Sequence, residues 1–126
     1  MRKSVVCAAS VAALAFGGVV AAAYADPPGC GALSVINVSS GGLMTATAEG
    51  SCNASQTRSL RVEIKHDESF APDPLVAANT QTATSQSYYV QVSSCDHGNT
   101  ATYYGRGYFT SYTTYHDSSH QKWHVC

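Results

Sequence analysis

Four cysteines, Cys30, Cys52, Cys95 and Cys126, constrain the fold of this chain more than any other feature. The fifth cysteine of the chain, Cys7, lies in the N-terminal 25 residues. The remaining even number in a short exported chain predicts two disulfides, and four cysteines allow three pairings. The short separations favour sequential pairing, because Cys30–Cys52 and Cys95–Cys126 would each tie the ends of a local strand–turn–strand unit. No Cys-x-x-Cys motif is present, which disfavours a zinc thiolate site.

The first 25 residues have the pattern of a secretion signal. Arg2 and Lys3 precede a long run of small apolar residues, and Ala-Tyr-Ala at positions 23–25 matches a cleavage site. A membrane anchor would need a more hydrophobic run. We therefore expect a signal peptide over residues 1–25 and one secreted, extracellular domain over residues 26–126, with no membrane insertion after cleavage.

Length and charge limit the classes of function open to the predicted mature chain. It carries five Lys/Arg against eight Asp/Glu, a balance that disfavours nucleic acids and anionic membranes as partners. Its size allows a single small domain, and its larger aliphatic residues are few. These features exclude a multidomain enzyme, a doubly wound nucleotide-binding fold and an integral membrane protein.

Short alternating segments separated by turn residues predict an all-β fold. The clearest alternation is 60–65, where Leu60, Val62 and Ile64 face one side, as in a half-buried antiparallel strand. Six or seven strands without any helical period favour a two-sheet antiparallel sandwich, immunoglobulin-like, that follows a short extended segment at 26–29. The other predicted strands cover 33–38, 43–48, 75–78, 86–92, 102–112 and 121–126, with breaks at 39–42, 50–55, 66–74 and 95–99.

Two glycines interrupt the predicted strand at 102–112. Gly105 and Gly107 lie on the same face of that strand because side-chain direction alternates with a period of two. Glycines in such positions indicate either a bulge or a close contact with another backbone.

The histidines are the main candidates for chemistry. His116, His120 and His124 are spaced i, i+4, i+8, a stripe that could bind zinc or copper on a helix. The Asp-Ser-Ser stretch that follows His116 is turn chemistry and contradicts a helix. No G-x-S-x-G motif is present, and two disulfides would leave no free thiol. We expect no catalytic activity, no metal site and no cofactor.

Tyrosines are the main candidates for a contact surface. Seven tyrosines follow position 25, and adjacent pairs such as Tyr103-Tyr104 should place one ring inward and the other outward. Outward tyrosines beside arginine and tryptophan have the composition of a protein–protein hot spot. The alternative is that the tyrosines replace scarce aliphatic residues in a thin core. The candidate contact surface comprises Tyr89, Tyr103, Tyr104, Arg106, Tyr108, Tyr112 and Trp123.

The overall pattern resembles small secreted proteins of filamentous Gram-positive bacteria. The shared features are the Arg-Lys-led signal ending in Ala-Tyr-Ala, the Asp-Pro-Pro-Gly-Cys segment and about 100 β-rich residues with four cysteines. In outline the chain is similar to the immunoglobulin-like adaptor subunit of bacterial umbrella toxin particles, which links a lectin-like subunit to a stalk. That resemblance implies a non-catalytic module that binds one or more secreted proteins.

A second resemblance is to the tendamistat-like amylase inhibitors, which are sandwiches with two sequentially paired disulfides. Their Trp-Arg-Tyr inhibitory turn is absent here, since Trp123 is flanked by Lys122 and His124. This resemblance implies the alternative function, a secreted inhibitor of an extracellular hydrolase.

Overall fold

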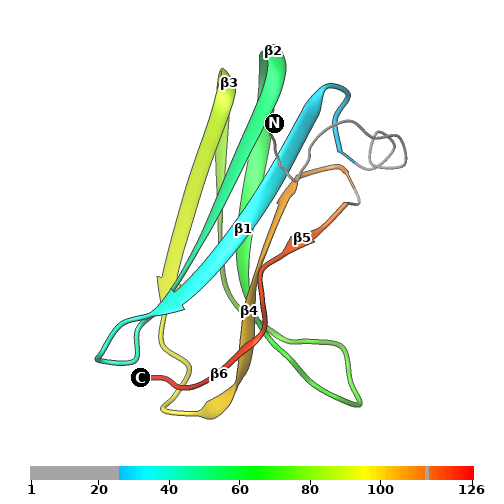
Figure 1. Ribbon diagram of the computed structural model, residues 1–126. Coiled ribbons are helices and arrows are strands. Elements are labelled where there is room, and N and C mark those ends of the chain that lie inside the picture. The colour runs from blue at the N-terminus through cyan, green and yellow to red at the C-terminus, as the bar shows by residue number, and fades with distance from the viewer. Residues whose placement is uncertain (1–25, 113) are drawn as a thin grey trace.

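A computed structural model describes residues 26–112 and 114–126, so the predicted signal peptide lies outside the described residues. The described residues form antiparallel strands and no helix, which confirms the all-β prediction (Figure 1). Disulfides join Cys30 to Cys52 and Cys95 to Cys126, the predicted sequential pairing. The strands are β1 (Cys30–Val38), β2 (Met44–His66), β3 (Leu75–Ser94), β4 (Thr100–Phe109), β5 (His116–Asp117) and β6 (Gln121–His124).

Strands β2 and β3 form one long ribbon that bends back over itself (Figure 1). The first half of β2 pairs with the end of β3, and its second half, from Gln56 onward, pairs with the start of β3 across a register shift. The predicted break at 50–55 is therefore wrong, because the strand bends there without ending. Likewise, the segments predicted as separate strands at 75–78 and 86–92 both belong to β3.

The bent ribbon produces a single curled sheet with the shape of a half-barrel. β1 pairs with the first half of β2, whereas β4 pairs with the second half and continues to β5 and β6. The expected sandwich of two separate immunoglobulin-like sheets is not confirmed, because β2 carries the hydrogen-bonded ladder from one layer into the other.

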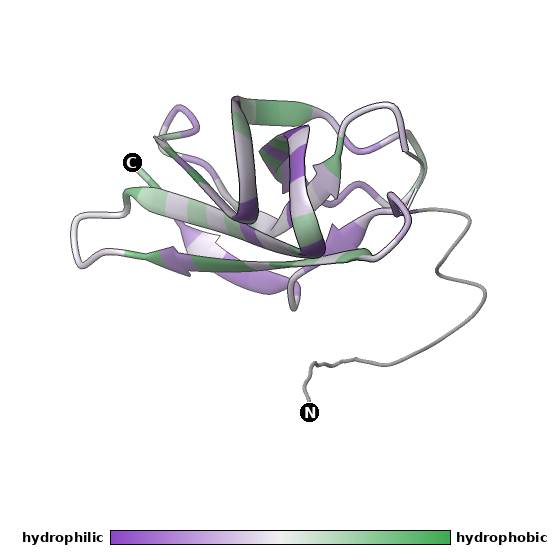
Figure 2. Cartoon of the chain, turned by 90° about the horizontal axis from the view of Figure 1, so that it is seen from above, coloured by the Kyte–Doolittle hydropathy of each residue, from purple (hydrophilic) through white to green (hydrophobic). Residues whose placement is uncertain are grey.

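The core lies inside the curl and contains many small residues. Leu60, Val62 and Ile64 are fully buried, as their alternation predicted. A Cβ atom added at Gly107 would lie 2.8 Å from the Cβ of Ala48, so the two layers approach very closely. The predicted close contact at this glycine is confirmed, and β4 pairs with β2 without a register shift. Seen from above, hydrophobic and hydrophilic residues alternate along the strands (Figure 2).

The segment 26–29 is turned and not extended, which corrects the sequence prediction. The Cys30 amide donates to the Pro27 carbonyl at 3.0 Å, and Gly29 has a φ of 75°. Pro28 followed by a glycine at positive φ is the pattern of a type II turn. This turn places Asp26, which is almost fully buried, 3.0 Å from the Nε2 atom of His116.

The described residues contain no helix that is long and apolar enough to cross a membrane.

Candidate protein-contact face

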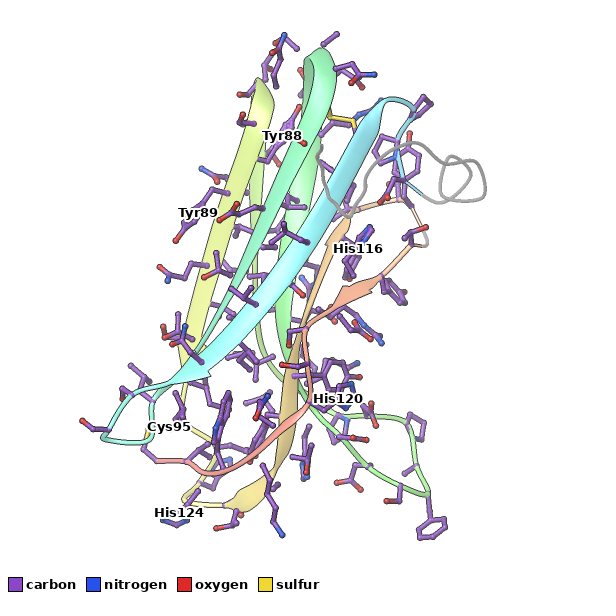
Figure 3. The ribbon with its side chains drawn as sticks, viewed as in Figure 1. Tyr88, Tyr89, Cys95, His116, His120 and His124 are labelled. Carbon is purple, nitrogen blue, oxygen red and sulfur yellow. A yellow bond between two sulfur atoms is a disulfide. The ribbon has the colours of Figure 1, made fainter. Side chains whose placement is uncertain are left out.

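Strand β4 carries alternate side chains on the side that faces away from the curl. Tyr104, Arg106 and Tyr108 occupy these positions, while Tyr103 and Phe109 point into the core. The segment after β4 lies against the same side and brings further aromatic and charged groups (Figure 3). We call this surface the outer β4 face and define it by Tyr104, Arg106, Tyr108, Tyr115, Asp117 and His120.

Arg106 is held at the centre of the outer β4 face. Its Nε and Nη2 atoms donate to the two carboxylate oxygens of Asp117 at 2.8 and 3.1 Å. Its guanidinium carbon lies 4.3 Å from the centre of the Tyr115 ring and 5.6 Å from that of Tyr104. The hydrogen bonds to Asp117 raise the pKa of Arg106 further above its usual value. A bidentate pair that also stacks on aromatic rings fixes the guanidinium in one orientation.

Tyr108 and Tyr115 form the aromatic side of the face. Their rings meet edge to face with centroids 4.8 Å apart. The Tyr108 hydroxyl donates to Glu63 at 2.9 Å, and the same carboxylate oxygen accepts from Nε of Arg61 at 2.8 Å. Burial and the bond to Glu63 raise the pKa of Tyr108, so this hydroxyl stays protonated and remains a donor. Tyr115 is half exposed and is the most accessible ring of the face.

Tyr104 lies beneath His120 and is almost fully buried. The two rings stack with centroids 4.2 Å apart and planes 6° from parallel. The Tyr104 hydroxyl donates to Asp73 at 2.5 Å, and His120 lies 2.9 Å from Asp67. Burial, followed by the bond to Asp73, raises the pKa of Tyr104, and the same bond lowers the pKa of Asp73. The loop that contains these two aspartates is thereby attached to the outer β4 face.

Adjacent tyrosines point to opposite sides of their strand in both pairs, as expected, but the outward ring is exposed in only one pair. Tyr88 is 6% exposed and its neighbour Tyr89 is 53% exposed, as expected. Tyr103 and Tyr104 are both buried, because the loop after β2 and the His120 ring cover the outward side of β4. The Tyr103 hydroxyl donates to Asp96 at 2.6 Å inside the molecule.

The structure brings together only part of the predicted contact surface. Tyr104, Arg106 and Tyr108 share the outer β4 face, whereas Tyr103 belongs to the core. The other predicted residues lie elsewhere: Tyr89 on the outer side of the opposite layer, Trp123 against the core from β6, and Tyr112 beyond the end of β4.

Sequence reasoning missed several residues of this region. Tyr115 could have been included, since it belongs to the same tyrosine-rich stretch. No sequence signal places Asp67, Asp73 or Asp117 beside β4, because these contacts depend on how distant segments pack.

The three spaced histidines have separate partners. His116 contacts Asp26 and His120 contacts Asp67, while Nδ1 of His124 lies 2.8 Å from the hydroxyl of Thr100. Within residues 26–112 and 114–126, no three His, Cys, Asp or Glu side chains are grouped closely enough to hold a metal ion.

No known family model matches this chain, and no curated protein is detectably similar to it in sequence. The function must therefore be inferred from the geometry of the surface itself. Neither the adaptor resemblance nor the inhibitor resemblance gains support from a relative.

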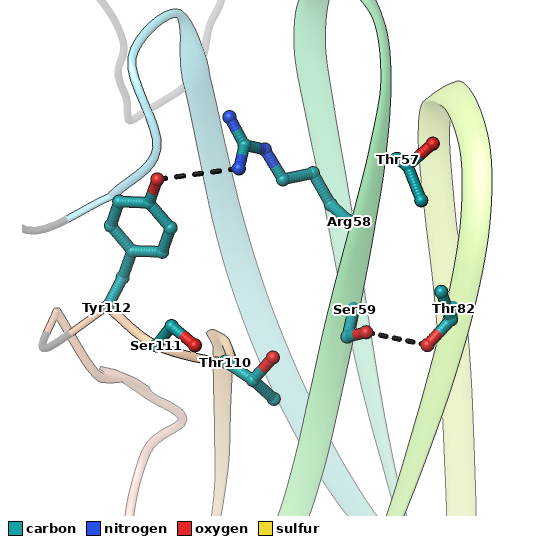
Figure 4. A pocket seen from close by; sticks show the side chains of 7 residues that line it. All are labelled: Thr57, Arg58, Ser59, Thr82, Thr110, Ser111 and Tyr112. Atoms are coloured by element: carbon teal, nitrogen blue, oxygen red, sulfur yellow. Dashed lines mark hydrogen bonds between the residues drawn. The ribbon is translucent and has the colours of Figure 1, made fainter.

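A second feature is a polar pocket beside the turn that follows β4 (Figure 4). It has a volume of about 430 Å³, and Arg58 Nη1 lies 3.4 Å from the Tyr112 hydroxyl across it. The Ser59 and Thr82 hydroxyls bond to each other at 2.6 Å. The lining consists of hydroxyl-bearing side chains and one guanidinium, and it contains no carboxylate or imidazole that could activate a hydroxyl as a nucleophile. Its residues are Thr57, Arg58, Ser59, Thr82, Thr110, Ser111 and Tyr112.

Proposed function

We propose that this chain is a secreted, non-catalytic protein-binding module that acts as an adaptor subunit in an extracellular assembly of the antibacterial toxin type. The outer β4 face is its contact surface. The observation that carries the proposal is the fixed arrangement of Arg106 between Asp117 and the rings of Tyr104 and Tyr115.

The composition of the face supports binding of a protein. Tyrosine and arginine are enriched among the residues that contribute most to protein–protein affinity. Tyr108 and Tyr115 supply large rings with few rotatable bonds, and Arg106 supplies a planar group for hydrogen bonding. These features fit a partner that presents a mixed apolar and polar surface.

The rigidity of the face also supports the proposal. Association costs free energy for every side chain that must be ordered, about 0.5–1.5 kcal/mol for a flexible one. Here Arg106 and Tyr108 are already held by Asp117 and Glu63. A partner can therefore bind the face without ordering its central side chains first.

The test is capture of a partner with matched variants of the secreted chain. Tyr115→Ala removes an exposed ring from the outer β4 face, and Tyr89→Ala removes an equally exposed ring from the opposite layer; the two residues are 51% and 53% exposed. Tagged wild-type chain in the culture medium of its source organism should retain a defined protein, identified by mass spectrometry and then purified. We expect Tyr115→Ala to weaken binding of that purified protein and Tyr89→Ala to leave it unchanged.

Three results would each contradict a part of the proposal. If the wild-type chain retains no protein, the proposed protein-binding function is wrong. If wild type and Tyr115→Ala bind the captured protein equally well, the outer β4 face is not the contact surface. If the captured protein is a hydrolase that loses activity at a one-to-one ratio, the inhibitor function replaces the adaptor function.

A further inference from the structure

The loop between β2 and β3, residues 67–74, presents a completely exposed aromatic ring. Phe70 is 102% exposed, whereas the other exposed large hydrophobic residues are only 40–53% exposed. Removing such a side chain from water is favourable, because its whole apolar surface is exposed. Scattered exposed apolar residues are ordinary in proteins, so the ring needs a second observation before it indicates a function.

The second observation is that this loop is held in place from both ends. The His66 amide donates to the Pro74 carbonyl at 3.1 Å, and the Asp67 amide donates to the Thr102 carbonyl at 2.8 Å. Within the loop, the Glu68 amide donates to Oδ1 of Asp73 at 2.8 Å. A loop restrained in this way loses little conformational entropy when its tip is bound.

The same loop is attached to the outer β4 face by two of its acidic side chains. Asp73 accepts from the Tyr104 hydroxyl at 2.5 Å, and Asp67 lies 2.9 Å from Nδ1 of His120. Two prolines, Pro72 and Pro74, further restrict its backbone. The Phe70 ring is thus carried on a restrained loop that is attached to the outer β4 face through Asp67 and Asp73.

The loop also carries acidic side chains and no basic ones. Asp67, Glu68 and Asp73 lie within residues 67–74, and no Lys or Arg lies there. The Glu68 side chain is 38% exposed, and its Oε2 atom lies 3.4 Å from Nδ1 of His66. A partner that covers this loop must offer positive charge around the place where the ring inserts. An anionic membrane surface is disfavoured because three carboxylates would be brought against it.

We propose that Phe70 is the anchor of the protein contact and that it inserts into an apolar pocket bordered by lysine or arginine side chains on a secreted partner. This inference rests on the proposed function and extends the outer β4 face to the 67–74 loop. The acidic residues have two roles: Asp67 and Asp73 position the loop, and Glu68 faces the basic border of the pocket.

The test compares Phe70→Ala with Leu33→Ala, in which an exposed apolar side chain is removed from the outer side of β1. The probe is the purified protein obtained by the capture experiment described above. We expect Phe70→Ala to weaken binding about 30-fold or more, as for a hot-spot residue, while Leu33→Ala binds like wild type. Both variants should melt like wild type, since neither side chain is buried.

The charge component has its own test. Glu68→Gln should weaken binding several-fold in low salt, and its affinity should depend less on salt concentration than that of wild type. If the affinities of wild type and Glu68→Gln depend equally on salt concentration, the proposed basic border of the pocket is wrong.

The identity of the molecule that contacts Phe70 is tested by placing the photo-reactive residue p-benzoylphenylalanine at position 70. Cross-linking should join this position to a partner peptide that contains lysine or arginine. Cross-links to a second copy of the chain, or to lipid, would overturn the inference in favour of those occupants.

The two proposals can fail separately. If Phe70→Ala binds within twofold of wild type while Tyr115→Ala binds weakly, the loop inference is wrong and the protein-binding function stands. If the wild-type chain captures no protein, the function itself is wrong and the loop inference falls with it.

Discussion

The closeness of the two layers makes Gly107→Ala a demanding test of the fold. The added Cβ would lie 2.8 Å from the Cβ of Ala48 and 3.3 Å from both the Leu33 carbonyl oxygen and the Cβ of Ser34. Carbon atoms normally pack at about 3.5–4.0 Å. None of these neighbours is the flexible end of a long side chain, so relief requires that a strand moves.

Overpacking of this kind costs about 1–3 kcal/mol. Because the new methyl group meets two strands of the opposite layer, we expect a loss near the upper end, about 3 kcal/mol. For a domain of this size each kcal/mol corresponds to roughly 4–8 °C, so the Tm should fall by about 12–24 °C. The measurement is urea or thermal unfolding with both disulfides intact. Gly31→Ala is the matched control, since a Cβ at Gly31 meets no atom within 4 Å.

A double variant tests the cause of the loss. Ala48→Gly alone should cost about 1.5 kcal/mol, from the lost methyl group and the flexibility of glycine in a strand. Combined with Gly107→Ala it removes the closest clash, so the double variant should be at least 1 kcal/mol more stable than the sum of the single losses predicts. Additive losses, or a Gly107→Ala variant as stable as Gly31→Ala, would refute the close packing described here.

Three further predictions concern stability. Replacing Cys95 and Cys126 by serine should lower the free energy of unfolding by about 3.7 kcal/mol, the chain-entropy value for a sequence separation of 31, as measured by urea unfolding. The Tyr103 hydroxyl lowers the pKa of Asp96, so the stability from this carboxylate is present above its ordinary pKa near 4 and is lost as the pH falls through the lowered pKa. Tyr103→Phe should therefore flatten the acid limb of a stability–pH curve below about pH 4. Tyr103→Ala should lose about 3–5 kcal/mol through a cavity, whereas Tyr89→Ala should change stability by less than about 0.5 kcal/mol in the same melts.

Local patterns in the sequence correctly predicted the connections at 39–42, 66–74 and 95–99, but they did not predict that β2 and β3 are continuous strands. The alternation at Leu60, Val62 and Ile64 is correct because one side of β2 faces the core along that stretch. The turn residues near Gly50 favour an interruption between two strands, yet in the structure they form a bend within β2. A bend and a break use the same small and polar residues, so only the pairing with β3 distinguishes them.

The candidate site was predictable in part for a similar reason. Strand periodicity placed Tyr104, Arg106 and Tyr108 on one side of β4, and the structure agrees. It did not predict that Tyr104 is covered, because the covering groups, Asp73 and His120, come from segments far away in the chain. Such long-range packing leaves no periodic trace in the sequence.

The positions of the two disulfides determine how the molecule responds to mechanical tension. A pull on the chain before Cys30 passes directly to Cys52, and a pull applied at Cys126 passes directly to Cys95. Only residues 53–94 then lie in the path of the force, and these form most of the bent β2–β3 ribbon. The outer β4 face belongs to the covalent loop between Cys95 and Cys126, whose own backbone is not stretched. An object tethered through either end of this chain would therefore extend the ribbon before it drew out the segment that carries Arg106 and Tyr115.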